Sequence, residues 1–313
     1  MNLPQIVFIV GPTAVGKSDI AVALAQKING EIVSADSMQV YKEVEIANNK
    51  PLNMMMEAVP HHLINVISVE EEFDVAKFYK LAQQAVEDIY ARNHVPIVVG
   101  GSGLYVQVLL NGIFEGNPKN EEFRQELYQL VEEKDNEFLY KRLKKQDPQS
   151  AERIHPNDIK RVVRALEVCE LGGQPISQVQ KERKGFLGKY DIKGFNLNRD
   201  REELYNKINR RVDEMVMRGL VDEIRGLESL KLSRTAQMLI GVKEVKAFFN
   251  GEYDVENAFY FMKRNTRQFA KRQITWFKRT ENFEWLKIKE GQSAEDMACI
   301  LEKSLQCPEP VKF

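Results

Sequence analysis

The stretch Gly11-Pro-Thr-Ala-Val-Gly-Lys17-Ser18, near the start of the chain, decides the fold. It matches the pattern GxxxxGK[ST] at every specified position. Apolar residues predict a buried strand before it, at Gln5–Val10, and helical spacing predicts a helix after it, through Lys27. A glycine-rich turn between a strand and a helix points successive backbone N–H groups at an anion. The stretch therefore predicts a phosphate-binding loop (P-loop) in an α/β fold.

Short apolar runs and helical patterns alternate outward from this loop. Strands are predicted at Glu31–Ala35, His62–Ile67, Pro96–Val99, Tyr190–Leu197 and Phe283–Ile288. A helix is predicted over Asp74–Arg92, with Phe78, Leu81, Ala85 and Ile89 on its apolar face, and another over Asp158–Leu171, closed by Gly172-Gly173. Strands that alternate with helices pair in parallel. We expect a P-loop nucleoside-triphosphate-hydrolase-like core with a mostly parallel sheet.

Two segments are predicted to be helical throughout, from Asn117 to about Asp147 and from Asp200 to about Thr280. In the second, Asp200 begins a helix with Glu203 as a capping partner. Its apolar stripe consists of Leu204, Ile208, Val212, Val216, Leu220 and Ile224. We expect residues 1–118, 148–200 and 281–313 to form the core, and residues 119–147 and 201–280 to form an all-helical subdomain.

The composition is that of a water-soluble globular protein. Of the 313 residues, 43% are hydrophobic and 29% charged, which argues against disorder. The longest apolar runs are too short for a membrane span, and no signal peptide is visible. The three cysteines, Cys169, Cys299 and Cys307, are scattered, so a disulfide framework or zinc site is not expected. These features predict a cytoplasmic protein.

The net charge is −1, but positive charge is concentrated near the end of the second helical segment. This basic segment has seven cations and no acid: Lys263, Arg264, Arg267, Lys271, Arg272, Lys278 and Arg279. Arg264, Arg267, Lys271 and Lys278 have the spacing of one helix face, which would turn Phe269, Ile274 and Phe277 mostly toward the helical core. Such a stripe can bind nucleic-acid phosphates, or it can be an ordinary solvated face.

Within the P-loop, Lys17 is expected to neutralise phosphate charge and the Ser18 hydroxyl to bind Mg²⁺. Many P-loop proteins also hold Mg²⁺ with an acid at the end of a buried strand. Here the strand at 97–99 ends in Gly100-Gly101-Ser102-Gly103. The available acid is Asp36, after the second strand. Because the strand ends of such a sheet meet where ligands bind, Asp36 is expected to face the P-loop.

Five blocks in this order resemble the tRNA dimethylallyltransferase (tRNA isopentenyltransferase) family of bacterial type. They are GPTAVGKS at 11–18, ADSMQVY at 35–41, PHHL at 60–63, GGSGLY at 100–105 and RQFAKRQITWF at 267–277. The resemblance extends from about residue 6 to about residue 288. It implies a prenyltransferase that moves the dimethylallyl group of dimethylallyl diphosphate to N6 of adenosine 37, beside the tRNA anticodon, and releases diphosphate with the help of Mg²⁺. The implied partners are the tRNA anticodon stem-loop and the donor, without a membrane, and the protein is expected to be a monomer.

The resemblance also implies a set of catalytic and donor-binding residues. Asp36 takes the position of the general base, although it could instead be an outer ligand of Mg²⁺ or a helix cap. Ser102 takes a hydroxyl position where many relatives have Thr, although it could instead cap the helix that begins near Leu104. Arg211 takes the position of a diphosphate-binding arginine, with Arg210 or a solvated helix face as alternatives. The donor is expected on Gly11, Thr13, Ala14, Val15, Gly16, Lys17 and Ser18.

For tRNA, the resemblance implies contacts from several segments that lie far apart in the sequence. Ser37, Met38 and Gln39, with Asp36 and Ser102, are expected to hold the extruded nucleotide. Further contacts are expected from Arg124, Lys160, Arg161, Val162, Val163, Arg164, Ala236, Gln237, Gly241 and Lys243, and the basic segment adds Arg267 and Lys271. The segments 119–147 and 201–280 would then form the tRNA-binding subdomain. His61 and His62 are expected in a turn or pocket wall rather than on a metal.

Two other functions fit parts of the sequence. A P-loop nucleotide or nucleoside kinase would use the same phosphate loop, but it would not need the basic helical segment. A non-catalytic tRNA-binding or GTPase-like module is the second alternative. A GTPase would usually carry an NKxD-type base-reading motif, and the sequence has none.

Overall fold

The structure, a computed structural model, describes residues 3–114, 120–281 and 283–306. Asn117, the predicted boundary at 118–119 and Cys307 lie outside the described residues. The chain divides into two compact units, which are Met1–Leu110 with Phe186–Phe313 (unit 1) and Asn111–Gly185 (unit 2). This division differs from the predicted one. Residues 148–185 belong with the helices of unit 2, whereas residues 201–280 belong with the sheet.

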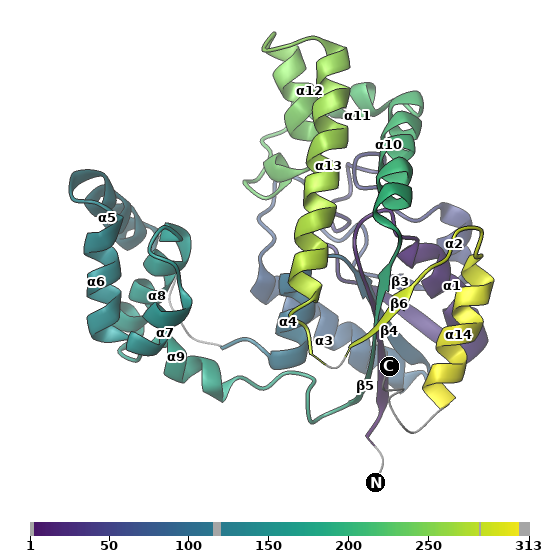
Figure 1. Cartoon of the computed structure of the whole chain (residues 1–313), viewed down its shortest axis with the longest axis horizontal. Coiled ribbons are helices and arrows are strands. Elements are labelled where there is room, and N and C mark those ends of the chain that lie inside the picture. The colour runs from purple at the N-terminus through teal and green to yellow at the C-terminus, as the bar shows by residue number, and fades with distance from the viewer. Residues whose placement is uncertain (1–2, 115–119, 282, 307–313) are drawn as a thin grey trace. The chain divides into compact units, whose positions relative to one another are not determined.

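Unit 1 contains a six-stranded sheet in the order β3-β2-β4-β1-β5-β6 (Figure 1). Every neighbouring pair among these described strands is parallel, which confirms the predicted α/β fold with a mostly parallel sheet. The strands are β1 Gln5–Val10, β2 Gly30–Ser34, β3 His61–His62, β4 Val95–Gly100, β5 Asp191–Asn198 and β6 Phe283–Lys287.

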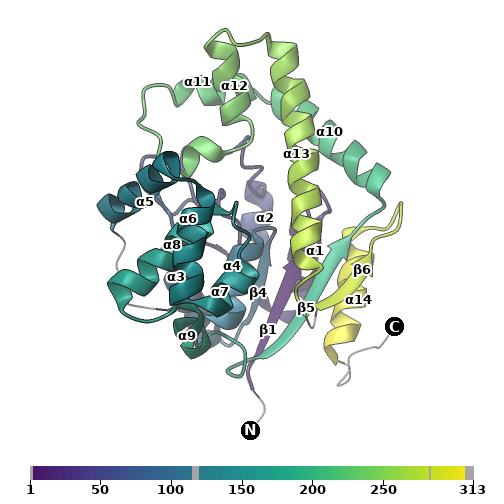
Figure 2. The same ribbon diagram turned by 60° about the vertical axis from the view of Figure 1, so that its left-hand side comes forward.

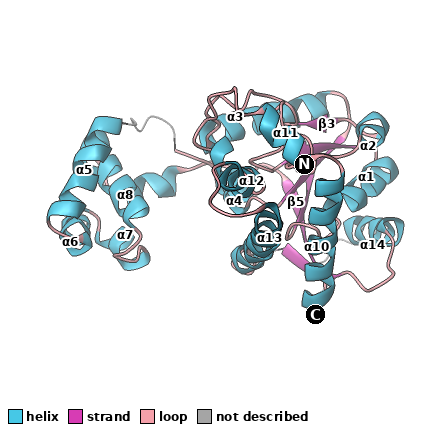
Figure 3. Cartoon of the chain, turned by 90° about the horizontal axis from the view of Figure 1, so that it is seen from above, coloured by secondary structure: helices cyan, strands magenta, loops and turns pink. Residues whose placement is uncertain are grey.

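Helices cover both faces of this sheet (Figures 1 and 3). Helices α1 (Lys17–Ile28) and α14 (Ala294–Gln306) pack on one face, against alternate residues of β1 such as Val7 and Ile9. Helices α3 (Val75–Ala91) and α4 (Gly103–Asn111) lie on the other face, where the rings of Phe78 and Tyr105 stack 3.9 Å apart. A central parallel strand covered on both sides must be apolar throughout, which explains the uninterrupted run in β1.

The register places the ends of β1 and β4 at one level, because Val10 lies opposite Gly100, whereas β5 continues two residues beyond Asn196, its partner for Val10. The loops that follow β1 and β4 therefore begin side by side at the carboxyl edge of the sheet. The short helix α2 (Asn53–Ala58) lies between β2 and β3 in the chain.

A group of helices in unit 1 lies beyond this carboxyl edge (Figure 2). It contains α10 Arg201–Met217, α11 Leu220–Gly226, the 3₁₀ turn η2 Ala236–Met238, α12 Val242–Phe249 and α13 Val255–Phe277. With 23 residues, α13 is about 35 Å long. The predicted apolar stripe is broken at Gly219, which has a φ of 94° and is the N-cap of α11, and Met215 rather than Val216 is buried in α10. Asp200 caps α10 as predicted, but Glu203 contacts Arg199 instead of completing the cap.

All regular secondary structure among the described residues of unit 2 is helical. Its elements are α5 Glu121–Glu133, α6 Asn136–Gln146, α7 Pro148–Arg153, α8 Ile159–Gly172, α9 Ile176–Val179 and η1 Gln180–Glu182. They enclose a separate core that includes Leu127, Leu143 and Leu166. The Phe186 N–H donates to the Leu109 carbonyl at 2.8 Å, so the chain leaves unit 1 and returns to it at neighbouring points.

Two local predictions were wrong. The strand predicted over His62–Ile67 is reduced to His61–His62, because Leu63 and Asn65 have φ values of 64° and 57° and cannot continue an extended strand. On α3, Leu81 is exposed and Ala82 is buried instead. Among the described helices, none combines the length and the apolar character needed to cross a bilayer.

Candidate active site

The P-loop joins β1 to α1 and packs against the end of β5. A Cβ atom on Gly11 would lie 2.4 Å from the Leu197 carbonyl oxygen, so only glycine fits there. The Arg199 Nε group donates to the Val15 carbonyl at 2.9 Å. The loop therefore presents its backbone at the N-terminus of α1, the position where a helix favours an anion.

Lys17 folds back over this loop. Its Nζ donates to the carbonyls of Gly11 and Pro12 at 3.0 and 2.8 Å. Burial lowers the pKa of the Lys17 ammonium group to about 8, Asp36 opposes this shift, and Arg211 adds to it. A lysine whose positive charge is costly to bury gains from binding an anion.

Arg211 reaches the same loop from α10. Its Nη2 donates to the hydroxyl of Thr13, and its buried Nε has no hydrogen-bond partner. Burial lowers the pKa of the guanidinium, while Asp36 and then Glu214 raise it. Arg210, the alternative, is paired instead with Glu214 at 3.5 Å and is largely exposed. Of the two neighbouring arginines, the structure therefore places Arg211 at the P-loop.

Asp36 lies just beyond β2, and its loop meets the loop after β4. The Asp36 Oδ1 atom accepts the Met38 N–H at 2.8 Å. The Ser102 Oγ atom accepts the Ser37 N–H at 3.2 Å. The structure thus brings together Lys17, Asp36, Ser102 and Arg211, which come from four separate segments. Ser18, the predicted Mg²⁺ ligand, is partly exposed in the first turn of α1.

The segment after Asp36 is held partly by its own hydrogen bonds. The Ser34 hydroxyl donates to Gln39 Oε1 at 2.8 Å, so this amide, predicted to meet a base, contacts protein here. The Met38 carbonyl accepts from Asn48 Nδ2 at 2.5 Å. Ser37, Met38 and Gln39 are all partly exposed.

The basic segment lies on α13 and just beyond its end, but its members differ in their contacts. Arg267 donates to Asn209 Oδ1 on α10 at 2.6 Å, and Lys263 pairs with Asp213 at 2.5 Å. Arg264 lies over the ring of Phe261, and Arg272 over that of Phe269. Lys271, Lys278 and Arg279 are exposed. Of the apolar residues that alternate with them, Phe277 is fully buried, whereas Phe269 and Ile274 are partly buried.

In unit 2, the predicted tRNA-contacting residues have different environments. Arg124 and Arg164 both bind the buried carboxylate of Glu167, Arg124 through two hydrogen bonds of 2.9 Å. Val162 and Val163 are buried in the core of the unit, so their side chains are not available to RNA. Lys160 and Arg161 are exposed.

The predicted contacts at 236–243 lie around η2 and the start of α12. Ala236 is buried, and Gly241, also buried, donates its N–H to Glu244 at 2.8 Å. Gln237 and Lys243 are exposed, and Gln237 donates to the Leu232 carbonyl at 2.9 Å.

Sequence reasoning missed Gln273 on α13. This side chain is 6% exposed and touches both the P-loop and Gly101. The buried positions of α13 include Ala270, Gln273 and Phe277, which have helical spacing. A glutamine in such an apolar stripe is the pattern that could have identified it.

A second charged cluster lies at the beginning of β2. Glu31 is 2% exposed and binds Arg92 through two hydrogen bonds of 3.0 and 2.8 Å, His62 at 2.6 Å and His94 at 2.8 Å. Hydrogen bonds from Arg92, and also from His62, lower the pKa of Glu31 to about 2, although burial opposes this. His61 contacts the Val59 carbonyl through Nδ1 at 2.7 Å. Each of these five side chains has a partner within the fold.

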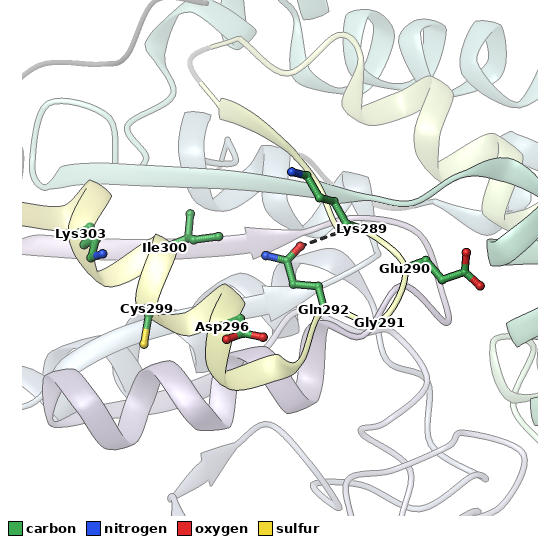
Figure 4. A pocket seen from close by; sticks show the side chains of 8 residues that line it. All are labelled: Lys289, Glu290, Gly291, Gln292, Asp296, Cys299, Ile300 and Lys303. Atoms are coloured by element: carbon green, nitrogen blue, oxygen red, sulfur yellow. Dashed lines mark hydrogen bonds between the residues drawn. The ribbon is translucent and has the colours of Figure 1, made fainter.

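A surface pocket lies between the loop after β6 and α14 (Figure 4). Its lining consists of Lys289, Glu290, Gly291, Gln292, Asp296, Cys299, Ile300 and Lys303, none of which belongs to the predicted site. Gln292 and Asp296 close local turns by accepting N–H groups from Lys289 and Ser293. The charged groups gathered around the P-loop mark the candidate site better than this pocket does.

The fold and the site define a class: a P-loop α/β protein whose phosphate loop meets Lys17 and Arg211, with the carboxylate of Asp36 beside them. The particular family follows from comparison with known proteins. Residues 39–280 match the model of the IPP transferase family. The chain belongs to this family, which confirms the resemblance seen in the five motifs.

Similar proteins extend over nearly the whole chain. A tRNA dimethylallyltransferase of Alkaliphilus oremlandii is 42% identical over 302 residues, which are 95% of this chain and 96% of that protein. One of Thermotoga neapolitana is 46% identical over 280 residues, or 89% and 90% of the two chains.

Solved structures give the same result. A tRNA isopentenylpyrophosphate transferase of Bacillus halodurans has a TM-score of 0.72, with 37% identity and 96% of each chain covered. A eukaryotic dimethylallyltransferase acting on tRNA has a TM-score of 0.83 and 31% identity, and the match covers 99% of this chain and 81% of that one.

Proposed function

We propose that this chain transfers the dimethylallyl group of dimethylallyl diphosphate to N6 of adenosine 37 in tRNA, releasing diphosphate. The chain is an enzyme of a prenyltransferase family whose curated relatives are named tRNA dimethylallyltransferase. The observation that carries the mechanism is the convergence of Lys17 and Arg211 on the P-loop, with Asp36 as the carboxylate beside them. Two cations and one carboxylate leave net positive charge, which suits a diphosphate.

The leaving group carries the charge that develops in this reaction. As the C–O bond of the donor breaks, negative charge grows on the diphosphate. Lys17, Arg211 and the backbone N–H groups of the P-loop would stabilise that charge. Because Arg211 already binds Thr13, it would reach the diphosphate beside that residue.

Asp36 would act as the general base. The adenine amine is a weak nucleophile, and it must lose a proton as its bond to carbon forms. The Asp36 Oδ1 atom is oriented by the Met38 N–H, which fixes the carboxylate and leaves it a second oxygen for the amine proton. Ser102, which contacts Ser37, would orient the amine or a phosphate oxygen.

The residues present also fit Mg²⁺. Among the described residues, no three His, Cys, Asp or Glu side chains form a metal site, so a metal here would depend on few protein ligands. Mg²⁺ binds in this way, through one or two protein oxygens together with substrate phosphates and water. Ser18, in the first turn of α1, is the residue that would hold it, and the ion would neutralise charge on the leaving diphosphate.

For tRNA, exposed cations in both units are the proposed phosphate contacts. They are Lys160 and Arg161 in unit 2, and Lys243 and Lys271 in unit 1. Arg124 and Arg164 would instead shape the surface through Glu167. Ser37, Met38 and Gln39 would hold the extruded base, provided that Gln39 exchanges its bond with Ser34 for the base. A monomer in the cytoplasm, where this substrate is found, remains our expectation.

One experiment separates this function from a kinase. Unmodified tRNA, together with a mixture of nucleosides and nucleoside monophosphates as possible phosphate acceptors, is mixed with the protein and either labelled dimethylallyl diphosphate or ATP labelled on its terminal phosphate. We expect the prenyl label on adenosine 37 and no transfer of the phosphate label. Phosphoryl transfer without prenyl transfer would establish the kinase alternative.

A further inference from the structure

A buried glutamine on α13 connects the two loops that form the candidate site. Gln273 Oε1 accepts the Thr13 N–H at 2.8 Å, and Gln273 Nε2 donates to the Gly101 carbonyl at 2.9 Å. One amide thus satisfies a donor of the P-loop and an acceptor of the loop after β4. Neither a carboxylate nor an apolar side chain can serve both groups.

The loop after β4 is held closely between Gln273 and the Asp36 loop. A Cβ atom on Gly101 would lie 2.2 Å from Gln273 Nε2. A Cβ atom on Gly100 would lie 2.2 Å from the Ala35 carbonyl oxygen. The position of Gln273 therefore determines where this loop lies, and through it where Ser102 meets Ser37.

A second helix reaches the same residue of the P-loop. Arg211 of α10 binds the hydroxyl of Thr13, while Gln273 of α13 binds its N–H. The two helices are joined to each other by the Arg267–Asn209 hydrogen bond and the Lys263–Asp213 ion pair. A displacement of α13 would therefore move both contacts to Thr13 together.

We propose that Gln273 is a positioning residue that couples the position of α13 to the diphosphate-binding loop, so that tRNA and donor bind with linked affinities. The inference rests on the proposed function, because α13 carries Lys271, a proposed tRNA contact. When RNA fixes α13, Gln273 holds Thr13 and Gly101 in place, and the P-loop is ordered before the donor arrives. Such preordering strengthens binding of the second ligand.

The test measures the affinity of inorganic diphosphate with Mg²⁺, by calorimetry, without and with a saturating unmodified anticodon stem-loop. For the wild-type protein, we expect RNA to tighten diphosphate binding by at least about fivefold, the lower end of typical coupling between sites. In Gln273→Met, this ratio should fall to within about twofold of unity, while RNA alone binds as before. Gln268→Met, an exposed glutamine on the same helix, is the matched control and should keep the wild-type ratio.

Gln273→Glu provides a second variant if Gln273→Met does not fold. It keeps an acceptor for Thr13 but loses the donor to Gly101, so its ratio should be clearly smaller than that of the wild type. The proposal would be overturned if RNA tightened diphosphate binding by the wild-type protein less than about twofold. It would also be overturned if either Gln273 variant showed the same tightening as the wild-type protein. Failure of the proposed function would be seen separately, as no prenyl transfer to the same RNA by the wild-type protein.

Discussion

Strand β2 has one carboxylate at its beginning and another just beyond its end, and their surroundings differ. Glu31 meets Arg92, His62 and His94, which satisfy both of its oxygens inside the fold. Asp36 lies instead beside Lys17 and Arg211, whose charges exceed its own. A dense group of charges is therefore no sign of a site in itself. Charge that the protein leaves unbalanced is the better indication.

The largest effect on activity should come from removing the carboxylate of Asp36. We expect Asp36→Asn to lower kcat by about 10²–10⁴-fold, because an amide cannot accept the amine proton. The amide oxygen can still accept the Met38 N–H, so the free energy of unfolding should change by less than about 0.5 kcal/mol. Single-turnover kinetics and denaturant unfolding give both values. A rate within about threefold of wild type would remove Asp36 from the role of base.

Lys17→Met should lower kcat/KM for the donor by about 10²–10³-fold, the effect of losing one electrostatic group at the developing charge. The affinity for tRNA, measured by filter binding, should be unchanged. An equal loss of tRNA affinity would contradict a role confined to the diphosphate.

The pH dependence of diphosphate binding sharpens the assignment of Lys17. Its pKa is lowered to about 8 in the free protein, so Lys17 loses its charge as the pH rises through 8. Bound diphosphate would raise that pKa, and affinity should therefore fall by up to about tenfold per pH unit above 8. Lys17→Met is the control, because its remaining pH dependence belongs to the ligand. Identical profiles for the two proteins would contradict the prediction.

Glu31→Gln should have the opposite consequence to Asp36→Asn. The stability of the protein should fall, whereas its activity should stay within about threefold of wild type. The pKa of Glu31 is about 2 in the folded protein, below its unfolded value, so its contribution is present above about pH 4.5 and disappears as the pH falls toward 2. The contribution is at most about 3 kcal/mol. Urea unfolding of both proteins between pH 7 and pH 3 should show their difference shrinking with acid. A difference that does not depend on pH would mean that packing, not charge, stabilises this cluster.

The smallest expected effect concerns surface cations. Lys271 and Lys278 are exposed, whereas Arg124 and Arg164 are neutralised by Glu167. Changing both lysines to Gln should reduce the slope of log affinity for tRNA against log salt by roughly 0.7–0.9 per lost phosphate contact. The pair Lys144 and Lys145, exposed on α6 and outside the predicted contacts, gives a control of equal charge. Equal salt slopes for the two double variants would mean that Lys271 and Lys278 lie on an ordinary solvated face and do not contact phosphates.

Local sequence patterns predicted most of the core. Strand β1 and helix α8 with its Asp158 cap follow from hydrophobic periodicity and capping residues, which act over a few neighbours. The strand at His62–Ile67 was overpredicted, because Leu63 is left-handed and leucine gives no sign of that backbone, although Asn65 is a residue type that favours it.

The candidate site was only partly accessible to sequence reasoning. The P-loop is continuous in sequence and was predicted in full. Gln273 is 260 residues from Thr13, and no local pattern could connect them. Likewise, the pairing of Arg124 and Arg164 with Glu167 depends on the packing of α5 against α8, which sequence spacing alone does not give.

The insertion of unit 2 between α4 and β5 has a consequence for synthesis on the ribosome. Strands β1, β2 and β4 are complete once Gly100 is made, but β5, which covers the other edge of β1, begins only at Asp191. At ordinary rates of translation, this interval lasts about 5 to 20 s. Throughout it, the apolar strand Ile6–Val10 has an open edge, and such edges pair readily with other chains. Nascent chains should therefore depend on chaperones most strongly while unit 2 is being translated.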